Sequence, residues 1–277
     1  GEINNDSEFS TYLAEHADIF INDAFGTSHR AHASNVGVAS IANESAIGLL
    51  MEKEIKYLGE TMNAPEEPCV VILGGAKIGD KITLIKNMME KADSILIGGA
   101  MAFTFLKIQG KNVGSSLIDE DNLNTAEEIL RLANNTNTNI VLPLDAVAGP
   151  KLSDDATWRV ASLDELKNNE AGYDIGPETT MEFEMVLSNA KTIIWNGPLG
   201  VSEIPAFSTG TQAIASAVID QTEDGAISII GGGDTASALK QYGLDKGFTH
   251  ISTGGGASLQ LMSGKQLPAL EALKEYA

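Results

Sequence analysis

Six short apolar runs in this chain each end in glycine or in a turn, and helical periodicity follows most of them. The runs are rich in β-branched residues, which is typical of strands that are buried on both faces. They cover residues 69–73, 94–97, 139–142, 192–195, 226–230 and 250–253. Strands that alternate with helices predict a parallel sheet covered by helices. We therefore predict an α/β fold of three layers, with a six-stranded parallel Rossmann-like sheet in the middle.

Right-handed crossovers would place all the strand-to-helix turns at one edge of this sheet, where open α/β sheets bind ligands. Two of the turns, 231–233 and 254–256, are runs of three glycines. Glycine lets a backbone approach a ligand closely, and a helix that begins there offers free N–H groups and a positive dipole end. Asp234 and Thr235 follow the first turn and could simply cap the helix. Alternatively, Asp234 would hold Mg²⁺ beside bound phosphates.

A net charge of -20 argues against nucleic acid and anionic membranes as partners. Phosphate must then be held by local features, and Lys77 and Lys81 lie four residues apart, on one helical face. Because the helix dipole disfavours cations at an N-terminus, this pair predicts an anion between them. The plainer alternative is two solvated lysines with Asp80 as partner. The segment is not a Walker A loop, since Asp80 stands where that motif has lysine.

Two further segments carry candidate contacts. Asn196 begins a Gly-Pro turn after the fourth apolar run, and Glu203 in the same segment could accept hydrogen bonds from a ribose. His29 and Arg30 lie in a loop over 23–34, and Arg30 is the single Lys or Arg of the first fifty residues. It is a natural contact for an anionic substrate, although a plain surface loop is an equally simple reading.

Together these segments resemble phosphoglycerate kinase, in order and in character. The segments are 23–34, 74–81, 98–106, 174–177, 195–203, 228–235 and 250–258. The resemblance implies an enzyme of glycolysis and gluconeogenesis that transfers a phosphoryl group reversibly between 1,3-bisphosphoglycerate and Mg-ADP, giving 3-phosphoglycerate and ATP. It also implies two α/β domains that close around the substrates, and a monomer. Nucleic acid and membranes are not expected partners.

The resemblance also implies roles for individual residues. The expected catalytic residues are Arg30, Lys77, Lys81, Gly232 and Gly255. The expected nucleotide contacts are Gly75, Lys77, Lys81, Gly99, Gly172, Asn196, Glu203, Gly232, Gly233, Asp234 and Thr235. Arg30, and more weakly His29, would bind phosphoglycerate, while Asp234 would bind Mg²⁺. Four residues depart from the usual family pattern, at Gly79, Ala100, Tyr173 and Ser202.

A long amphipathic helix is predicted over 44–63, and Pro65 and Pro68 end it. With the resemblance, this gives a remnant of the phosphoglycerate-binding domain over 1–42 and an interdomain helix over 43–64. A nucleotide-binding domain over 65–262 and a tail over 263–277 would follow. The chain begins at Gly1 in a polar stretch, which suggests a cut, and measured against the resembled family most of the N-terminal domain is expected to be missing.

The lone Cys69, the lack of a signal peptide and the lack of a long apolar stretch favour the cytoplasm. Two other functions remain open. The chain could bind nucleotide without turnover. It could also be a dinucleotide oxidoreductase, because 231–236 fits a loose Rossmann pattern. That reading is weak, since the acidic residue expected about 20 positions later is absent and the two lysines would have no role.

Overall fold

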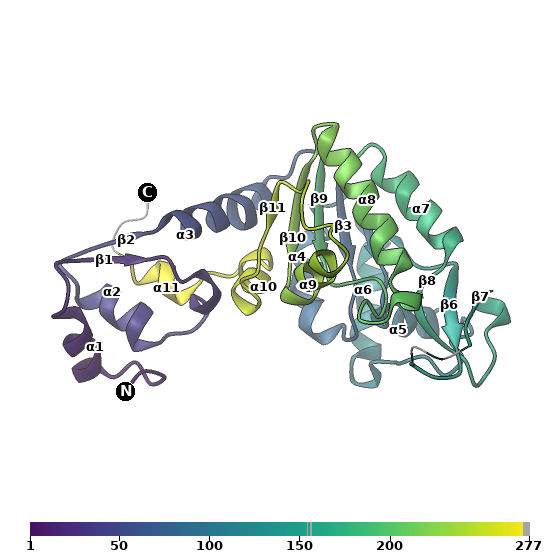
Figure 1. Cartoon of the computed structure of the whole chain (residues 1–277), viewed down its shortest axis with the longest axis horizontal. Helices are drawn as coiled ribbons and strands as arrows, with labels where there is room; N and C mark the ends of the chain where they lie inside the picture. The colour runs from purple at the N-terminus through teal and green to yellow at the C-terminus, as the bar shows by residue number, and fades with distance from the viewer. Residues whose placement is uncertain (154, 156, 274–277) are drawn as a thin grey trace. The chain divides into compact units, whose positions relative to one another are not determined.

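The computed structural model describes residues 1–153, 155 and 157–273. They divide into two compact units (Figure 1). The first unit comprises residues 1–64 and the described residues from Ser252 onward. The second comprises residues 65–251. Among the described residues, no helix combines the length and the apolar character that crossing a membrane requires.

The second unit is built on a six-stranded parallel sheet, as predicted. The strands are β3 (Cys69–Leu73), β4 (Ser94–Ile97), β5 (Asn139–Val141), β9 (Thr192–Asn196), β10 (Ile227–Gly231) and β11 (His250–Ile251). Their order in the sheet is β11-β10-β9-β3-β4-β5. The chain therefore runs outward from β3 in one direction and from β9 in the other. The point between β3 and β9 is the topological switch point, where open sheets of this kind bind ligands.

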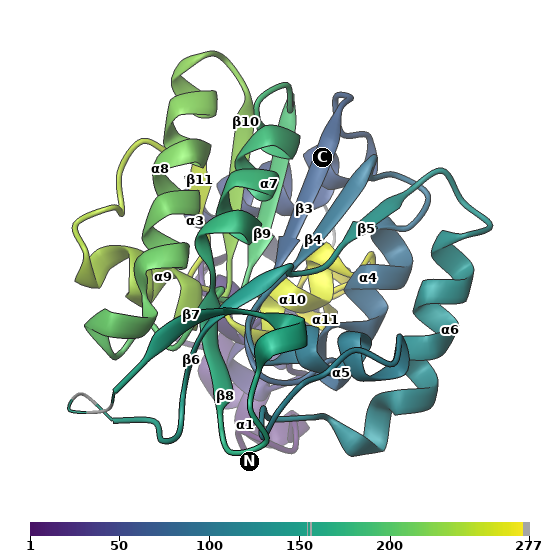
Figure 2. The same cartoon turned by 90° about the vertical axis from the view of Figure 1, so that its right-hand side faces the viewer.

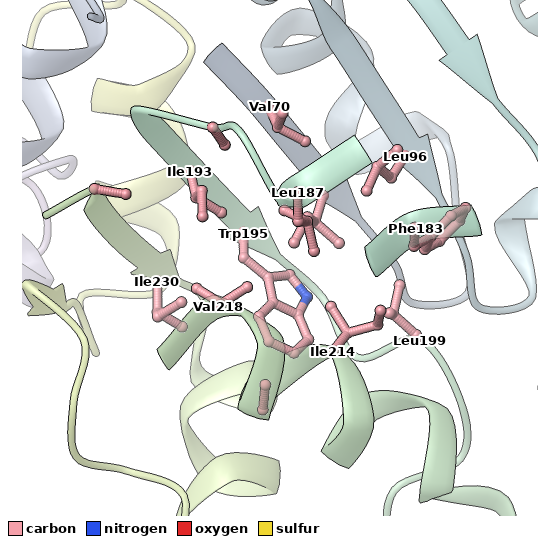
Figure 3. Packing of buried hydrophobic residues seen from close by; sticks show 14 of the residues in the cluster. Val70, Leu96, Phe183, Leu187, Ile193, Trp195, Leu199, Ile214, Val218 and Ile230 are labelled. Atoms are coloured by element: carbon pink, nitrogen blue, oxygen red, sulfur yellow. The ribbon is translucent and has the colours of Figure 1, made fainter. Parts of the chain in front are cut away.

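Helices α7 and α8 pack on one face of this sheet. Phe183 and Leu187 of α7 and Ile214 of α8 join residues of the strands in one apolar cluster (Figure 3). Trp195 lies at the centre of this cluster, fully buried, and its indole Nε1 donates to the carbonyl of Gly197 at 2.8 Å. Figure 2 shows α4 and α6 on the opposite side of the sheet. The helices of this unit are α4 (Ile82–Met88), α5 (Met101–Ile108), α6 (Leu123–Ala133), α7 (Pro177–Leu187), α8 (Thr209–Glu223) and α9 (Gly233–Gln241).

Short one-turn segments complete the second unit: η4 (Gly79–Lys81), η5 (Glu120–Asn122), η6 (Leu163–Glu165) and η7 (Pro205–Phe207). A second, antiparallel sheet was not predicted. It has the order β7-β6-β8, formed by β7 (Arg159–Ser162), β6 (Asp145–Gly149) and β8 (Ala171–Ile175). Its apolar face packs with Phe103 and Leu106 of α5. The strands carry small residues such as Ala146 and Ala148, so their apolar pattern is weak.

The first unit contains a two-stranded parallel sheet of β1 (Ile19–Asn22) and β2 (Glu44–Ile47). Its helices are α1 (Ser7–Ala14), α2 (Val38–Ile41), α3 (Leu49–Glu54), α10 (Gly256–Met262) and α11 (Pro268–Glu271). Its remaining turns are η1 (Phe25–Thr27), η2 (Ala33–Gly37) and η3 (Ile55–Thr61), of which η2 and η3 are π-helical.

The predicted helix over 44–63 was wrong at its N-terminal end. Residues 44–47 form β2, and the helix begins only at Leu49. The Asp23 carboxylate accepts hydrogen bonds from the N–H groups of Leu50 (2.8 Å) and Met51 (3.0 Å), so it caps the helix from a distant loop. Gly48 permits this approach, since a Cβ there would overlap the Asp23 side chain. A cap 27 residues away in sequence leaves no local signal.

Candidate nucleotide-binding site

Three loops leave the same edge of the central sheet beside one another. The last residues of β3, β9 and β10 are in register, since Asn196 pairs with Leu73 on one side and with Gly231 on the other. The lysine loop 74–81, the turn 197–200 and the glycine turn 231–233 therefore emerge side by side. This is the arrangement that the sequence predicted for a ligand site, and it lies at the switch point.

The first two loops are joined through their backbones. Gly74 N–H donates to the carbonyl of Asn196 at 3.0 Å, and Gly75 N–H donates to that of Pro198 at 2.9 Å. A Cβ on Gly74 would overlap the carbonyl oxygen of Pro198, so the contact requires glycine. The two loops thus form one continuous wall.

The third loop presents the start of α9. Gly232 adopts φ 93°, a left-handed conformation that favours glycine. Ala236 N–H donates to the Gly232 carbonyl at 3.1 Å, so the N–H groups of residues 233–235 precede this bond and point out of the helix. Free N–H groups and the positive end of the dipole suit a phosphate.

The Thr235 side chain ties the third loop to the second. Its hydroxyl is buried, donates to the carbonyl of Gly231 at 3.0 Å and accepts from Gly197 N–H at 2.7 Å. The hydroxyl is thus engaged within the protein, which leaves the backbone N–H of Thr235 as its group for a ligand.

A cavity of about 310 Å³ lies among these loops. It brings together eight of the residues expected to contact nucleotide: Gly75, Lys77, Lys81, Asn196, Gly232, Gly233, Asp234 and Thr235. Asp80 also lines it, as do Ala76, Gly197 and Pro198. The prediction that these segments converge on one place is confirmed.

Opposite charges face one another in this cavity. Lys77 is exposed and Lys81 is half-buried, and a Cβ built on Gly75 would lie 3.5 Å from Lys81 Nζ. Burial lowers the pKa of Lys81, while the carboxylates of Asp80 and Asp234 act in the opposite direction. The positive charges of the two lysines and the negative charges of the two carboxylates can therefore compensate one another. A phosphate that binds together with a metal cation would keep the net charge of the cavity nearly unchanged.

A second cavity of about 300 Å³ continues from the first, with Gly75, Ala76, Pro198 and Asp234 lining both. It contains the three other expected nucleotide residues, Gly99, Gly172 and Glu203. Its apolar walls are Leu117, Leu152, Tyr173 and Val201, which the sequence did not single out as ligand contacts. Apolar walls beside a single carboxylate suit a nucleoside.

Asp234 is the candidate metal ligand. Within the described residues, no group of three or more His, Cys, Asp or Glu side chains could hold a metal ion. Mg²⁺ typically uses one or two carboxylates and completes its shell with phosphate oxygens and water. A single exposed carboxylate at the start of α9, where phosphates can also bind, fits that chemistry.

The remaining predicted residues, Arg30, His29 and Gly255, belong to the first unit. Arg30 is exposed, and its Nε donates to His29 Nε2 at 3.3 Å. Burial, followed by the nearby Arg30 charge, lowers the pKa of His29, so it is a weak anion ligand at pH 7. The glycine turn 254–256 packs here, because a Cβ on Gly256 would lie 2.9 Å from His29 Nε2.

Comparison with known proteins identifies the family. The sequence profile described as "Phosphoglycerate kinase" matches residues 1–265. The chain belongs to the phosphoglycerate kinase family. The phosphoglycerate kinase of Thermosipho africanus is 52% identical over 99% of this chain and 68% of its own length, and that of Chloroherpeton thalassium is 49% identical over 97% and 68%. The solved phosphoglycerate kinase of Coxiella burnetii covers 99% of this chain and 70% of its own, with 41% identity and a TM-score of 0.92.

Two departures from the phosphoglycerate kinase pattern lie in the nucleoside cavity. Ala100 has φ -64°, a helical conformation open to any residue, so no glycine is needed. The ring of Tyr173 packs against that of Phe207, with centroids 4.9 Å apart.

The other two departures are packed in loops. Ser202 is buried, and its carbonyl accepts a hydrogen bond from the hydroxyl of Tyr242 at 2.8 Å. Gly79 lies against Asn122, since a Cβ there would be 3.1 Å from Asn122 Nδ2. Each departure is thus compatible with the kinase fold around it.

Sequence reasoning missed two carboxylates that support the phosphoglycerate kinase cavities. Asp119 accepts hydrogen bonds from the lysine loop. Asp174 is buried and accepts from the N–H groups of Gly210 (2.8 Å) and Ile175 (2.9 Å), while burial raises its pKa to about 7. Asp174 was noted only as part of the segment 174–177, and neither residue has a local signal that reveals its partner.

Proposed function

We propose that the chain serves in the phosphoglycerate kinase reaction, reversible phosphoryl transfer between 1,3-bisphosphoglycerate and Mg-ADP. The second unit would be its nucleotide-binding domain, holding ADP or ATP with the phosphates in the cavity of about 310 Å³ and the nucleoside in the adjoining one. The observation that carries this proposal is the convergence of two lysines, two carboxylates and the start of α9 on a single cavity.

The reaction needs no general base among these residues. The attacking group is a carboxylate or a nucleotide phosphate oxygen, and both are deprotonated at neutral pH. Catalysis then depends on positioning and on neutralisation of charge. Lys77 and Lys81 would neutralise the transferring and nucleotide phosphates, while Gly232, Gly233 and Thr235 would donate backbone N–H groups to them.

Asp234 would hold Mg²⁺ together with the nucleotide phosphates. The metal, when bound, neutralises phosphate oxygens and fixes their orientation. Glu203, Gly172 and Gly99 would line the nucleoside position, and Gly75 lines both cavities.

The first unit would supply the phosphoglycerate contacts. Arg30 is exposed and always charged, so it is the stronger candidate. His29 is the weaker one, because its lowered pKa leaves it mostly neutral at pH 7. Gly255 would offer a backbone donor to the transition state. We further propose a cytoplasmic monomer with no nucleic-acid or membrane partner, in keeping with the net charge of -20.

Calorimetry with Mg-ADP tests the nucleotide role directly. The unmodified chain should bind Mg-ADP, and Lys81→Ala should weaken binding at least tenfold. Lys91→Ala is the control, because Lys91 follows α4, where its Nζ donates to Asn87 at 3.2 Å, and it does not line the cavity. No binding by the unmodified chain would overturn the proposal.

A second function, nucleotide binding without turnover, is favoured by one observation. Both cavities are lined entirely by residues of the second unit, so nucleotide binding would not require contacts from the first. A spectrophotometric assay with ATP and 3-phosphoglycerate separates the two functions. Turnover above background that Arg30→Ala abolishes supports the kinase, whereas binding without turnover supports the module.

A further inference from the structure

The carboxylate of Asp119 holds the backbone of the lysine loop. Asp119 Oδ2 accepts hydrogen bonds from the N–H groups of Ile78, at 3.0 Å, and Gly79, at 3.4 Å. These two groups lie at the start of η4, the single turn that ends at Lys81, and Lys77 immediately precedes them. Asp119 is 41 residues away in sequence from Ile78.

Asp119 is itself fixed through both its side chain and its backbone. Asn122 Nδ2 donates to both of its oxygens, at 3.0 and 3.1 Å. The N–H of Asp119 donates at 2.9 Å to the hydroxyl of Thr104, which is buried on α5. Asp119 therefore transmits the position of α5 to the lysine loop, because both ends of the connection are hydrogen-bonded.

Gly79 makes the loop depend on this support. Glycine has more backbone freedom than any other residue, so a loop that contains it is more costly to order. The lack of a Cβ also lets Asn122 approach to 3.1 Å from the Cβ position, beside the carboxylate that it orients. Gly79 thus makes the loop more flexible and also leaves space for Asn122 and Asp119, which hold the loop in place.

We propose that Asp119 is a positioning residue that orders Ile78 and Gly79 and so aims Lys77 and Lys81 at the nucleotide phosphates. This inference rests on the proposed nucleotide site. Asp119 acts through backbone geometry, since its carboxylate accepts hydrogen bonds from the N–H groups of Ile78 and Gly79. The nucleoside cavity does not include Asp119, so its effect should be confined to the phosphates.

The test compares two ligands in the full chain by calorimetry, Mg-ADP and adenosine. Asp119→Ala should weaken Mg-ADP binding about tenfold and change adenosine binding less than twofold, because misplacement of a charged group by a fraction of an ångström costs phosphate binding alone. Asp119→Asn should stay within about threefold of the unmodified chain, because its amide oxygen can still accept from Ile78.

Asp93→Ala is the matched control. Asp93 accepts a hydrogen bond from the Cys69 N–H at 2.6 Å, at the opposite end of β3 from the lysine loop. It should lower the melting temperature comparably and leave both affinities unchanged. Equal loss for both ligands in Asp119→Ala, or an equal effect of Asp93→Ala, would show a merely structural role and overturn the inference.

Two results distinguish this inference from the proposed function. If Mg-ADP binds, Lys81→Ala weakens it and Asp119→Ala does not, the positioning role alone is overturned. If the unmodified chain binds no Mg-ADP, the proposed function fails, and this inference fails with it.

Discussion

Asp234 is the one charged residue among the four that line both cavities. As the single candidate metal ligand, it should control the dependence of ADP binding on Mg²⁺. We expect that Mg²⁺ strengthens ADP binding to the unmodified chain, and that Asp234→Asn removes most of this gain. Titrations with ADP in Mg²⁺ and in EDTA measure it. Glu178→Gln, which also removes a charge from the first turn of a helix, should leave the gain intact.

A second prediction at this scale concerns Asp174, whose burial raises its pKa to about 7. The folded carboxyl keeps its proton up to that pH, whereas the unfolded chain releases it near pH ~4. The protonated Asp174 carboxyl therefore stabilises the folded state, fully below pH ~4, and this contribution is lost as the pH rises through about 7. The shift corresponds to a loss of up to about 4 kcal/mol in the free energy of unfolding.

Asp174→Asn cannot titrate, so it isolates this effect. The difference in unfolding free energy between the unmodified chain and Asp174→Asn should fall as the pH rises from about 4 to 8 and then level off. Urea unfolding at several pH values measures it. A difference that does not vary with pH would show that Asp174 is ionised throughout.

Single residues also show the limit of sequence reading. All eleven expected nucleotide residues line one or the other cavity. Most of them follow parallel strands, whose turns must meet at one edge, whereas Gly172 lies in β8 of the antiparallel sheet and was expected from the resemblance alone. Asp119 and Asp23 could not be predicted in the same way. Their partners lie 41 and 27 or 28 residues away, and such contacts follow from tertiary packing rather than from local periodicity.

At the scale of elements, the Thr235 hydroxyl connects α9 with the turn after β9. Thr235→Val keeps the shape but leaves the buried Gly197 N–H without an acceptor, at a cost of about 1–3 kcal/mol in unfolding free energy. It should also weaken Mg-ADP binding severalfold, because the two loops no longer share a fixed geometry. Chemical denaturation and calorimetry measure the two effects.

Thr180→Val is the control for this prediction. Thr180 also donates to a carbonyl four residues earlier, that of Gly176, at 2.9 Å. It lies on α7, away from the cavities. A smaller stability loss and unchanged nucleotide binding are expected. Equal effects of both substitutions on Mg-ADP binding would contradict a specific connection through Thr235.

The elements themselves were predictable to different degrees. The six parallel strands carry continuous apolar runs, and all six were found within a few residues of the predicted bounds. The antiparallel sheet was missed because β6 reads Asp-Ala-Val-Ala-Gly, which gives no clear alternation. The strand β2 was read as helix because Glu44–Ile47 precedes a true helix with no break that the sequence reveals until Gly48.

At the scale of the whole molecule, the first unit leaves apolar surface exposed. Ile19 and Ile21 lie on one face of β1 and are 54% and 53% exposed. Their sheet has two strands, so its outer edges have unpaired backbone groups. We expect self-association at high protein concentration, and Ile19→Thr with Ile21→Thr should reduce it without a change in Mg-ADP affinity. Static light scattering over a concentration series measures association.

Met181→Thr with Met185→Thr is the control for this surface. These residues are 62% and 64% exposed on α7, so the pair removes similar apolar area from a helix, which offers no strand edge. Association should change little. If the control pair reduced self-association more, the associating surface would lie on the second unit instead.

The backbone hydrogen bonds between the lysine loop and the turn after β9 have a consequence for synthesis of the chain. Gly74 and Gly75 need the carbonyls of Asn196 and Pro198, more than a hundred residues later. During translation, the lysines leave the ribosome long before the wall that supports them exists. The lysine loop cannot take its final conformation until the turn after β9 has been synthesised. Nucleotide capture by a nascent chain would therefore report that synthesis has passed β10 and the start of α9.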